Sequence, residues 1–196
     1  MNIGVLALQG AVAEHIRRIE SCGASGTVVK RTEQLETLDG LIIPGGESTT
    51  IGKLMRTYGF IDAVRGFAAQ RKPVFGTCAG LILLAKRIEG QEEPHLALMD
   101  ITVARNAFGR QRESFEVDLE VKGWNRPVRS VFIRAPLIKS VGPEVDVLST
   151  CRDGIVCVRQ EHLLGASFHP ELTDDNSMHE YFLQMVKDYT ASVGNR

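Results

Sequence analysis

The sequence lacks a surplus of either charge, because 23 basic side chains stand against 24 acidic ones among its 196 residues. A nucleic acid or an anionic membrane surface would require a basic excess, so neither is expected as the main partner. The chain also lacks a basic leader and any apolar stretch long enough to span a membrane. We therefore expect a cytoplasmic protein whose partners must be inferred from its sites.

Cysteine is sparse, and its four positions show none of the close pairing of metal-binding motifs. They are Cys22, Cys78, Cys151 and Cys157. This scatter fits a reducing compartment, and it predicts neither a metal site nor a cofactor. Internal repeats and low-complexity tracts are also absent, and the chain is long enough to bury a core without covalent cross-links. We expect residues 1–196 to form one domain without a linker.

What the sequence does contain is an alternation of strand-like and helix-like segments over its first half. Strands are expected at residues 3–8, 27–29, 40–43 and 73–75, and helices at residues 12–22, 48–57 and 61–70. Alternation of this kind predicts a parallel sheet, and right-handed crossovers place helices on both of its faces.

The pattern changes after Pro94 to short runs rich in β-branched residues. These runs are residues 100–104, 115–121, 128–133, 145–149, 154–158 and 163–168. They predict hairpins and strands of a mixed sheet. A last helix follows the polar segment 173–176, where apolar residues recur at helical spacing and indicate core contacts. Together, the predicted segments indicate an α/β fold with a mixed, mainly parallel sheet.

Cys78 stands on a sharp turn between a predicted strand and a run, residues 81–84, that we expect to be helical. Gly76 and Gly80 flank it two positions away on either side, so a strand can fold back into a helix without side-chain collision. Backbone N–H groups and the positive end of the helix stabilise a thiolate, the form that attacks carbon. Cys78 is a candidate nucleophile, and the alternative is a cysteine that only fills space.

His169 and Glu171 follow the strand expected at 163–168, and an extended segment directs side chains two residues apart to the same side. A carboxylate that holds one imidazole nitrogen leaves the other free to take a proton from a thiol. Ligand sites of parallel sheets lie at the carboxyl ends of the strands, where Cys78 is also expected. The alternative is a surface histidine with a simple salt partner.

The remaining histidines have no acid two residues further on at a strand end. They are His15, His95, His162 and His179, and we expect each to be solvated or structural. A metal site built from Cys78, His169 and Glu171 would need a second cysteine or histidine, and none stands nearby in the sequence.

A glycine-rich loop, residues 44–48 (Pro-Gly-Gly-Glu-Ser), follows the strand expected at 40–43. Its backbone N–H groups at a helix start suit a developing negative charge. A phosphate loop is the alternative, but five residues separate Gly46 from Gly52, Leu54 stands where Ser or Thr should bind magnesium, and Glu47 would repel phosphate. Stabilisation of an oxyanion is the better interpretation.

Together these segments resemble the class I glutamine amidotransferases with a Cys-His-Glu triad, and more narrowly the family of glutaminase subunits of pyridoxal 5′-phosphate synthase. The motifs that carry the resemblance are GVLALQG at residues 4–10, PGGESTT at 44–50, GTCAG at 76–80, RNAFGRQ at 105–111 and SFHPELT at 167–173. The resemblance covers essentially the whole chain, and it implies a three-layer, flavodoxin-like fold.

The resemblance also implies a reaction, in which L-glutamine is hydrolysed to glutamate and ammonia for a separate synthase subunit that activates the glutaminase in a hetero-oligomer. Cys78 would attack the amide carbon, His169 would carry the proton, and Glu171 would orient His169. The N–H groups of Gly46 and Ala79 would form the oxyanion hole. Implied substrate contacts are Gly46, Glu47, Ser48, Arg105, Ile133 and Arg134, and we expect Gln9 and Gly10 to line the site.

Four alternatives remain at this point. The chain could supply ammonia to a different synthase, or it could be a peptidase-like relative with the same cysteine turn. It could also be a flavodoxin-like binding module or a silent regulatory subunit. The segment 105–112 holds three arginines, and it could be a solvated basic turn instead of part of the site.

Overall fold

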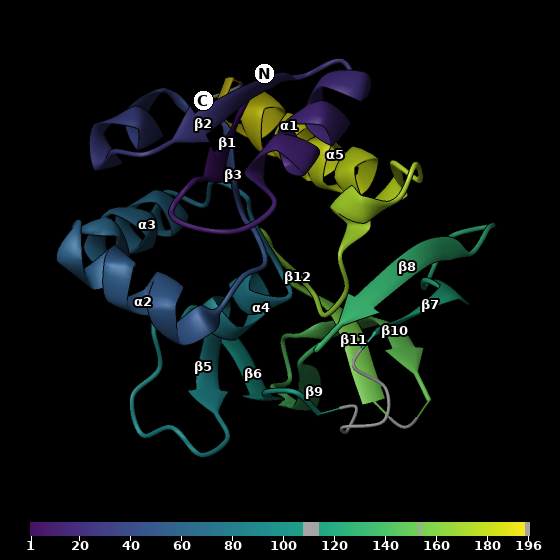
Figure 1. Ribbon diagram of the computed structural model, residues 1–196. Coiled ribbons are helices and arrows are strands. Elements are labelled where there is room, and N and C mark those ends of the chain that lie inside the picture. The colour runs from purple at the N-terminus through teal and green to yellow at the C-terminus, as the bar shows by residue number, and fades with distance from the viewer. Residues whose placement is uncertain (108–113, 153, 195–196) are drawn as a thin grey trace.

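The structure is a computed structural model that describes residues 1–107, 114–152 and 154–194 (Figure 1). The strands are β1 (Asn2–Leu6), β2 (Ser25–Val29), β3 (Gly40–Ile43), β4 (Val74–Thr77), β5 (Ala85–Ile88), β6 (Met99–Ala104), β7 (Ser114–Leu119), β8 (Val128–Ile133), β9 (Leu137–Val141), β10 (Asp146–Cys151), β11 (Gly154–Gln160) and β12 (Leu163–Ala166). The helices are α1 (Val12–Ser21), α2 (Ser48–Thr57), α3 (Phe60–Ala69), α4 (Ala79–Leu84) and α5 (Ser177–Gly194), with 3-10 turns η1 (Thr32–Thr37) and η2 (Pro170–Leu172).

The large sheet has the strand order β2-β1-β3-β4-β12-β11-β9-β6-β5, and β10 pairs with β11 off this path. The first five of these strands are parallel. The pairs β12–β11, β11–β9 and β9–β6 are antiparallel, and the last pair, β6–β5, is parallel. A separate antiparallel pair is formed by β7 and β8. The expected mixed α/β fold with a mainly parallel sheet is confirmed.

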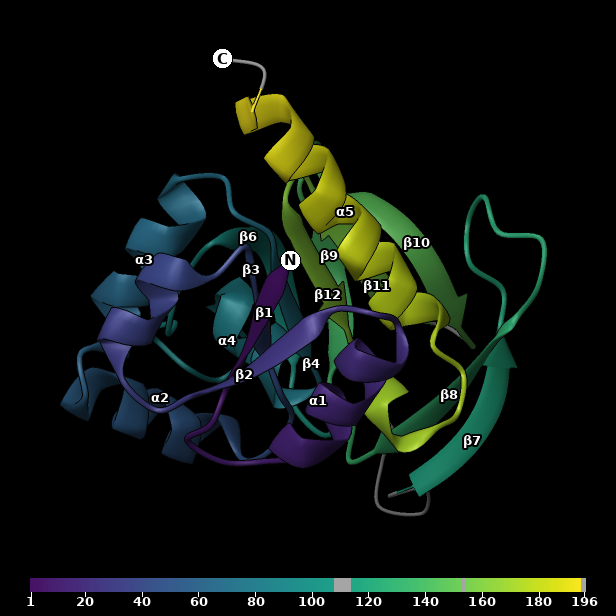
Figure 2. The ribbon, with the colours of Figure 1, turned by 90° about the horizontal axis from the view of Figure 1, so that it is seen from above.

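Alternate residues of the central strands face two separate apolar cores, because a strand directs successive side chains to opposite faces. Leu41 and Ile43 of β3 pack into the core beneath α2, α3 and α4, whereas Ile42 packs into the core beneath α1 and α5. The two helix groups therefore cover opposite faces of the sheet (Figure 2). Such strands are buried on both sides, which explains their continuous apolar sequence.

Two strands were not expected from the sequence. The run that forms α4 leads into β5 (Ala85–Ile88) with no turn residue between them, so periodicity cannot separate helix from strand there. The other is β9 (Leu137–Val141), which contains the exposed polar residues Lys139 and Ser140 and therefore lacks a clear apolar pattern. Both lie in the half of the sheet beyond β12, away from the ends of β3 and β4.

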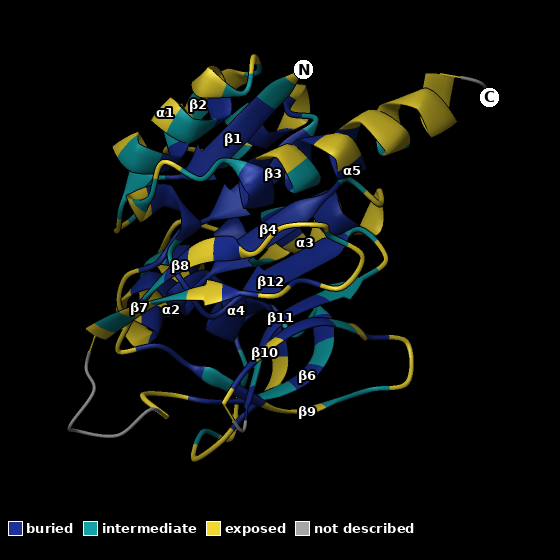
Figure 3. Cartoon of the chain, turned by 90° about the vertical axis from the view of Figure 1, so that its right-hand side faces the viewer, coloured by how far each residue is buried: buried dark blue, intermediate teal, exposed yellow. Residues whose placement is uncertain are grey.

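The last helix begins at Ser177 as expected and packs Met178, Phe182 and Val186 against the sheet. Its final turns, from Lys187 to Gly194, are largely exposed and extend past the sheet (Figure 3). In the described part of the chain, no helix is long and apolar enough to cross a membrane.

Candidate active site

The candidate site forms where three parallel strands end side by side. β3, β4 and β12 are neighbours in the sheet, and each leads into one of the loops selected from the sequence. The glycine loop follows Ile43, the cysteine turn follows Thr77, and His169 comes three residues after Ala166. The topology therefore brings together segments that are far apart in the chain.

The backbone of Cys78 adopts φ 50° and ψ −106° at the start of α4, a conformation that non-glycine residues rarely adopt. The flanking glycines are required for a second reason. A side chain at Gly80 would collide with the carbonyl of Ile43, and one at Gly76 would collide with the carbonyl of Gly80. The turn is thus compressed against β3, and it holds the thiol at the cavity that lies over the sheet edge.

His169 is linked to Glu171 by a hydrogen bond of 2.7 Å between Nδ1 and Oε1. The Glu171 side chain is fully buried, and that of His169 is 11% exposed. Burial alone would lower the pKa of His169, but the neighbouring Cys78 and Glu171 raise it to about 10. Burial would raise the pKa of Glu171, while His15 and His169 lower it. The pair therefore favours a carboxylate beside a basic imidazole.

The glycine loop packs directly against His169 and Cys78. A Cβ atom at Gly45 would lie 2.5 Å from Cε1 of His169 and 3.4 Å from Cβ of Cys78. Gln9 supports the loop, because its Oε1 accepts a hydrogen bond of 2.6 Å from the N–H of Glu47. A side chain at Gly10 would collide with the carbonyl of Gly45. Gln9 and Gly10 thus lie behind the loop and are not among the residues that line the cavity.

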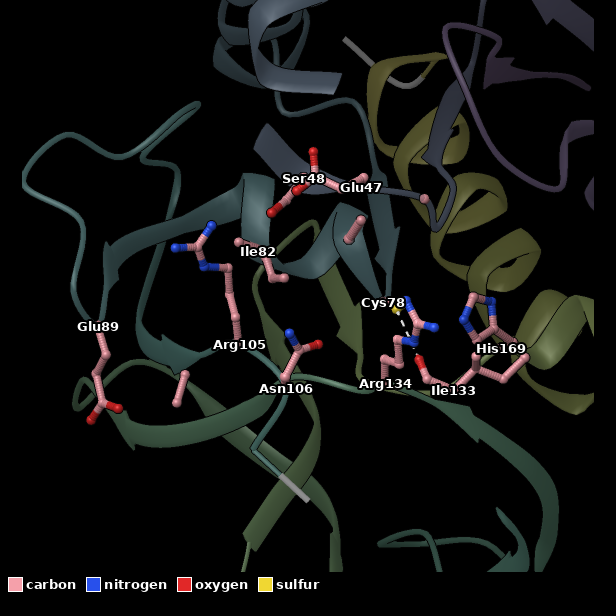
Figure 4. A pocket seen from close by; sticks show the side chains of 13 residues that line it. Glu47, Ser48, Cys78, Ile82, Glu89, Arg105, Asn106, Ile133, Arg134 and His169 are labelled. Carbon is pink, nitrogen blue, oxygen red and sulfur yellow. Dashed lines mark hydrogen bonds between the residues drawn. The ribbon is translucent and has the colours of Figure 1, made fainter. Parts of the chain in front are cut away.

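A cavity of about 820 Å³ opens beside the Cys78 thiol (Figure 4). Nine of the residues selected from the sequence line it: Gly46, Glu47, Ser48, Cys78, Ala79, Arg105, Ile133, Arg134 and His169. Four more lining residues were not selected from the sequence: Ile82, Glu89, Ala104 and Asn106, the last of which lies in the RNAFGRQ motif. Figure 4 places Glu89 at the end of the cavity remote from Cys78, with Arg105 between them.

Contacts of the lining residues distinguish their roles. The carboxylate of Glu47 caps α2, because it accepts hydrogen bonds from the N–H groups of Thr49 and Thr50 at 3.1 and 2.7 Å. A hydrogen bond from the hydroxyl of Thr50 at 2.7 Å, together with these two backbone bonds, lowers its pKa. Nη1 of Arg105 donates to Oγ1 of Thr49 at 3.2 Å. The thiol of Cys78 lies 3.9 Å from the carbonyl oxygen of Ile133. Residues 108–113, which carry the rest of the arginine-rich segment, lie outside the described residues.

The other histidines were expected to be solvated or structural, and at two positions the structure decides between these options. His15 and His179 are not solvated, since both are buried, and His15 approaches the second oxygen of Glu171. Neither residue has a sequence signal of its own, because α1 meets α5 and η2 only through the tertiary fold. His95 packs against Gly52 of α2, and His162 lies at the opposite end of β12 from His169. Within the described ranges, no group of three or more His, Cys, Asp or Glu residues could hold a metal ion.

A thiol, an imidazole and a carboxylate at one edge of an α/β sheet, beside a glycine loop at a helix start, are the features of cysteine-dependent amidohydrolases and amidotransferases. The chain belongs to the SNO glutamine amidotransferase family, whose model matches residues 5–188.

Individual relatives within this family are similar to the chain over nearly its whole length. The chain is 72% identical over 188 residues to a protein of Niallia circulans named pyridoxal 5′-phosphate synthase subunit PdxT, and the match covers 96% of this chain and 99% of that relative. A protein of the same name from Halalkalibacterium halodurans is 64% identical, and the match covers 96% of each chain.

Solved structures agree with this placement. A crystal structure described as a glutamine amidotransferase superimposes with a TM-score of 0.90 at 50% identity, covering 94% of this chain and 98% of the other. A putative GMP synthase protein of Thermoplasma acidophilum, with a TM-score of 0.73 at 15% identity, shares the fold, and the match covers 100% of this chain and 98% of the other.

Proposed function

We propose that this glutamine amidotransferase hydrolyses L-glutamine to L-glutamate and ammonia, with Cys78 as the nucleophile. The observation that carries the proposal is the position of the Cys78 thiol, which lies at a cavity of substrate size and beside a histidine that a buried carboxylate orients. Peptide hydrolysis by the same groups would not account for a glycine loop that closes one side of the cavity.

In the first step, the sulfur of Cys78 attacks the side-chain amide carbon of glutamine, and His169 takes the thiol proton. His169 then returns that proton to the departing nitrogen, so ammonia leaves and a thioester remains. Water attacks the thioester with His169 as the base, which releases glutamate and regenerates the thiol. Glu171 keeps the Nδ1 proton of His169 in place, so that Nε2 is the nitrogen that exchanges protons.

The N–H groups of Gly46 and Ala79 are the proposed oxyanion hole for both steps. Each donor of this kind contributes about 10² to 10³ in rate, and general acid–base transfer contributes about 10² to 10⁴. Neither effect alone accounts for amide cleavage. The geometry supports the proposal, because both residues line the cavity and Gly45 packs against Cys78 and His169.

Glutamine would lie in the cavity with its α-carbon end between the glycine loop and Arg105. The guanidinium of Arg105 suits the α-carboxylate. The Glu47 side chain is already held as the cap of α2, so Glu47 and Ser48 would contribute mainly backbone groups from the loop. Ile133 and Arg134 would close the side of the cavity nearest to the thiol.

We further propose that the ammonia passes to a separate synthase subunit that builds pyridoxal 5′-phosphate. The relatives that carry the name of such a synthase match nearly their whole length to this chain. We take residues 1–196 as one glutaminase domain of the three-layer, flavodoxin-like type, which the strand order β2-β1-β3-β4-β12 supports. A reducing, cytoplasmic setting suits the four free cysteines.

The test is the Cys78→Ala variant in complex with the synthase partner. We expect it to release no ammonia from glutamine above the uncatalysed rate, while its circular dichroism spectrum matches the wild type. Cys22→Ala, which removes a thiol that does not line the cavity, should retain full activity. Glutamine turnover by Cys78→Ala would assign the nucleophile elsewhere, and strong peptide cleavage by the wild-type chain without the synthase partner would argue for a peptidase.

A further inference from the structure

A row of buried polar side chains lies behind Glu171, on the side away from the cavity. Nε2 of His179 in α5 lies 2.9 Å from Nδ1 of His15 in α1. Nε2 of His15 lies 3.3 Å from Oγ1 of Thr77, at the end of β4, and 3.5 Å from Oε2 of Glu171. The last atom of this row is the carboxylate oxygen that His169 does not use.

Every member of the row is enclosed. His15 and Thr77 have no exposed surface, His179 is 1% exposed and Glu171 is 3% exposed. Within the described residues, Oε2 of Glu171 makes no regular hydrogen bond. A buried carboxylate oxygen without a donor is strongly unfavourable, so the approach of His15 is the contact that offsets its desolvation.

Burial lowers the pKa of His15 and of His179, which favours the neutral form of both. A neutral imidazole carries one proton, and two arrangements of the pair are conceivable. If His15 carried its proton on Nδ1, the lone pair of Nε2 would face the carboxylate of Glu171. The proton of His179 would then sit on Nδ1, which is buried without a partner among the described residues.

The opposite arrangement leaves no donor of the pair unpaired. His179 donates from Nε2 to Nδ1 of His15, and His15 donates from Nε2 toward Thr77 and Glu171. Both N–H dipoles then point toward the carboxylate, and the nitrogen left without a described partner is an acceptor, Nδ1 of His179. Hydrogen bonds aligned in this way polarise one another.

We propose that His15 is a positioning residue of the active site, which holds the Glu171 carboxylate ionised and correctly turned by donating its Nε2 proton. The role rests on the proposed glutaminase function, and it extends the Cys78, His169 and Glu171 set by one member that does not touch substrate. His15 acts without adding charge, so Glu171 keeps its full attraction for a protonated His169.

The charged and titratable groups that face this row come from several elements. They are Cys78, His169 and Glu171 on the site side, and Glu14, Arg18 and His179 on α1 and α5. None of them forms a hydrogen bond to Oε2 of Glu171 within the described residues, whereas Nε2 of His15 lies 3.5 Å from it. Removal of His15 should therefore make the carboxylate easier to protonate.

The first experiment uses the unaltered protein, with ¹⁵N-labelled histidine and NMR at pH 7. We expect His15 to be neutral with its proton on Nε2, and bonded at Nδ1 to His179. A charged His15, or one with its proton on Nδ1, would overturn the proposal. This measurement does not depend on activity, whereas a wild-type complex that fails to hydrolyse glutamine would overturn the proposed function instead.

The second experiment compares His15→Leu, His15→Gln and His162→Leu in the complex with the synthase partner. For His15→Leu we expect kcat to fall about tenfold or more with KM for glutamine unchanged, and the acid limb of the pH profile to move up by about one pH unit. His15→Gln keeps a donor at the Nε2 position and should restore the acid limb. His162→Leu, the same change at the far end of β12, should match the wild type.

A folded His15→Leu variant with the acid limb of the wild type would contradict the proposal. So would a folded His15→Gln variant whose limb is displaced as far as that of His15→Leu. A purely structural role would lower the amount of folded protein in both variants, but it would leave the position of the limb unchanged.

Discussion

Cys78 holds a backbone conformation that favours glycine, and it is not alone around the cavity. Asn106 and Arg134, which also line it, have φ of 50° and 44°. Residues in this region each cost about 1 to 3 kcal/mol and persist where the surroundings hold them in place. At Cys78 the strain has an identifiable function, because it directs the thiol out of the strand and toward His169 at the sheet edge.

This strain can be measured by removing the thiol in two ways. We expect Cys78→Gly to be more stable than Cys78→Ala by about 1 kcal/mol, because glycine adopts φ 50° without strain, while its greater freedom in the unfolded state offsets part of that gain. The free energy of unfolding in urea gives the difference. Ala63→Gly, within α3, is the control, and it should be destabilising. A Cys78→Gly variant less stable than Cys78→Ala would contradict the assignment of strain.

At the scale of elements, the start of α5 is tied to β8 by one carboxylate. Asp175 accepts hydrogen bonds from the N–H of Ser177 at 2.9 Å and from the N–H of Arg129 at 3.2 Å. Burial alone would raise the pKa of Asp175, but a hydrogen bond from the hydroxyl of Ser177, together with these two backbone bonds, lowers it. Its contribution to stability is therefore present above about pH 4, the ordinary value for an aspartate, and is lost as the pH falls through its depressed pKa.

We expect Asp175→Asn to cost about 1 kcal/mol of stability at pH 7, a small value because the carboxylate is partly exposed. The cost should shrink below about pH 4, where the wild-type carboxyl group becomes protonated as well. Urea unfolding at several pH values gives both quantities. Asp174→Asn, the same change at a fully exposed neighbour, should leave stability almost unchanged. A cost that stays constant from acid to neutral pH would rule out the carboxylate as its source.

The elements that the sequence predicted well are those with an unambiguous period or a marked boundary. The helix at Ser48–Thr57 has the expected bounds, and Glu47 caps its N-terminus. The first helix ends at Ser21, one residue before the end expected at Cys22. β5 was missed because its first residue continues the apolar run of α4, and its interior consists of exposed Lys86 and Arg87. The local sequence therefore predicts a helix or strand well where capping or turn residues mark its ends. It does not reveal where a helix changes into a strand within one continuous apolar segment.

At the scale of the whole molecule, the site depends on contacts of two kinds, and only one kind could be predicted. Cys78, His169 and Gly46 follow strands, so the rule that parallel strands end at one edge was enough to bring them together. His15 reaches Glu171 from a helix on one face of the sheet, far away in the chain, and no local pattern encodes that approach. The same holds for Glu89, which joins the cavity from the segment that follows β5.

Labelling of the four cysteines can test whether the fold makes one thiol more reactive than the others. Burial raises the pKa of Cys157 to about 12, and burial also raises the pKa of Cys22 and of Cys151. Of the four, Cys78 is the one that lines the cavity where a glutamine analogue would bind. With a glutamine-analogue electrophile at neutral pH, we expect one adduct per chain, at Cys78, identified by mass spectrometry of tryptic peptides.

Two controls show whether the selective labelling depends on the Cys78 thiol and on the folded structure around it. The Cys78→Ala variant should take no label from the analogue, and wild-type protein unfolded in urea should lose the preference for Cys78 when a simple alkylating agent replaces the analogue. Faster labelling of Cys22 or Cys151 than of Cys78 in the folded protein would contradict the assignment of the nucleophile. Selective labelling that disappears on unfolding would instead attribute the reactivity to the arrangement of strand ends, because the local sequence around Cys78 is the same in both states.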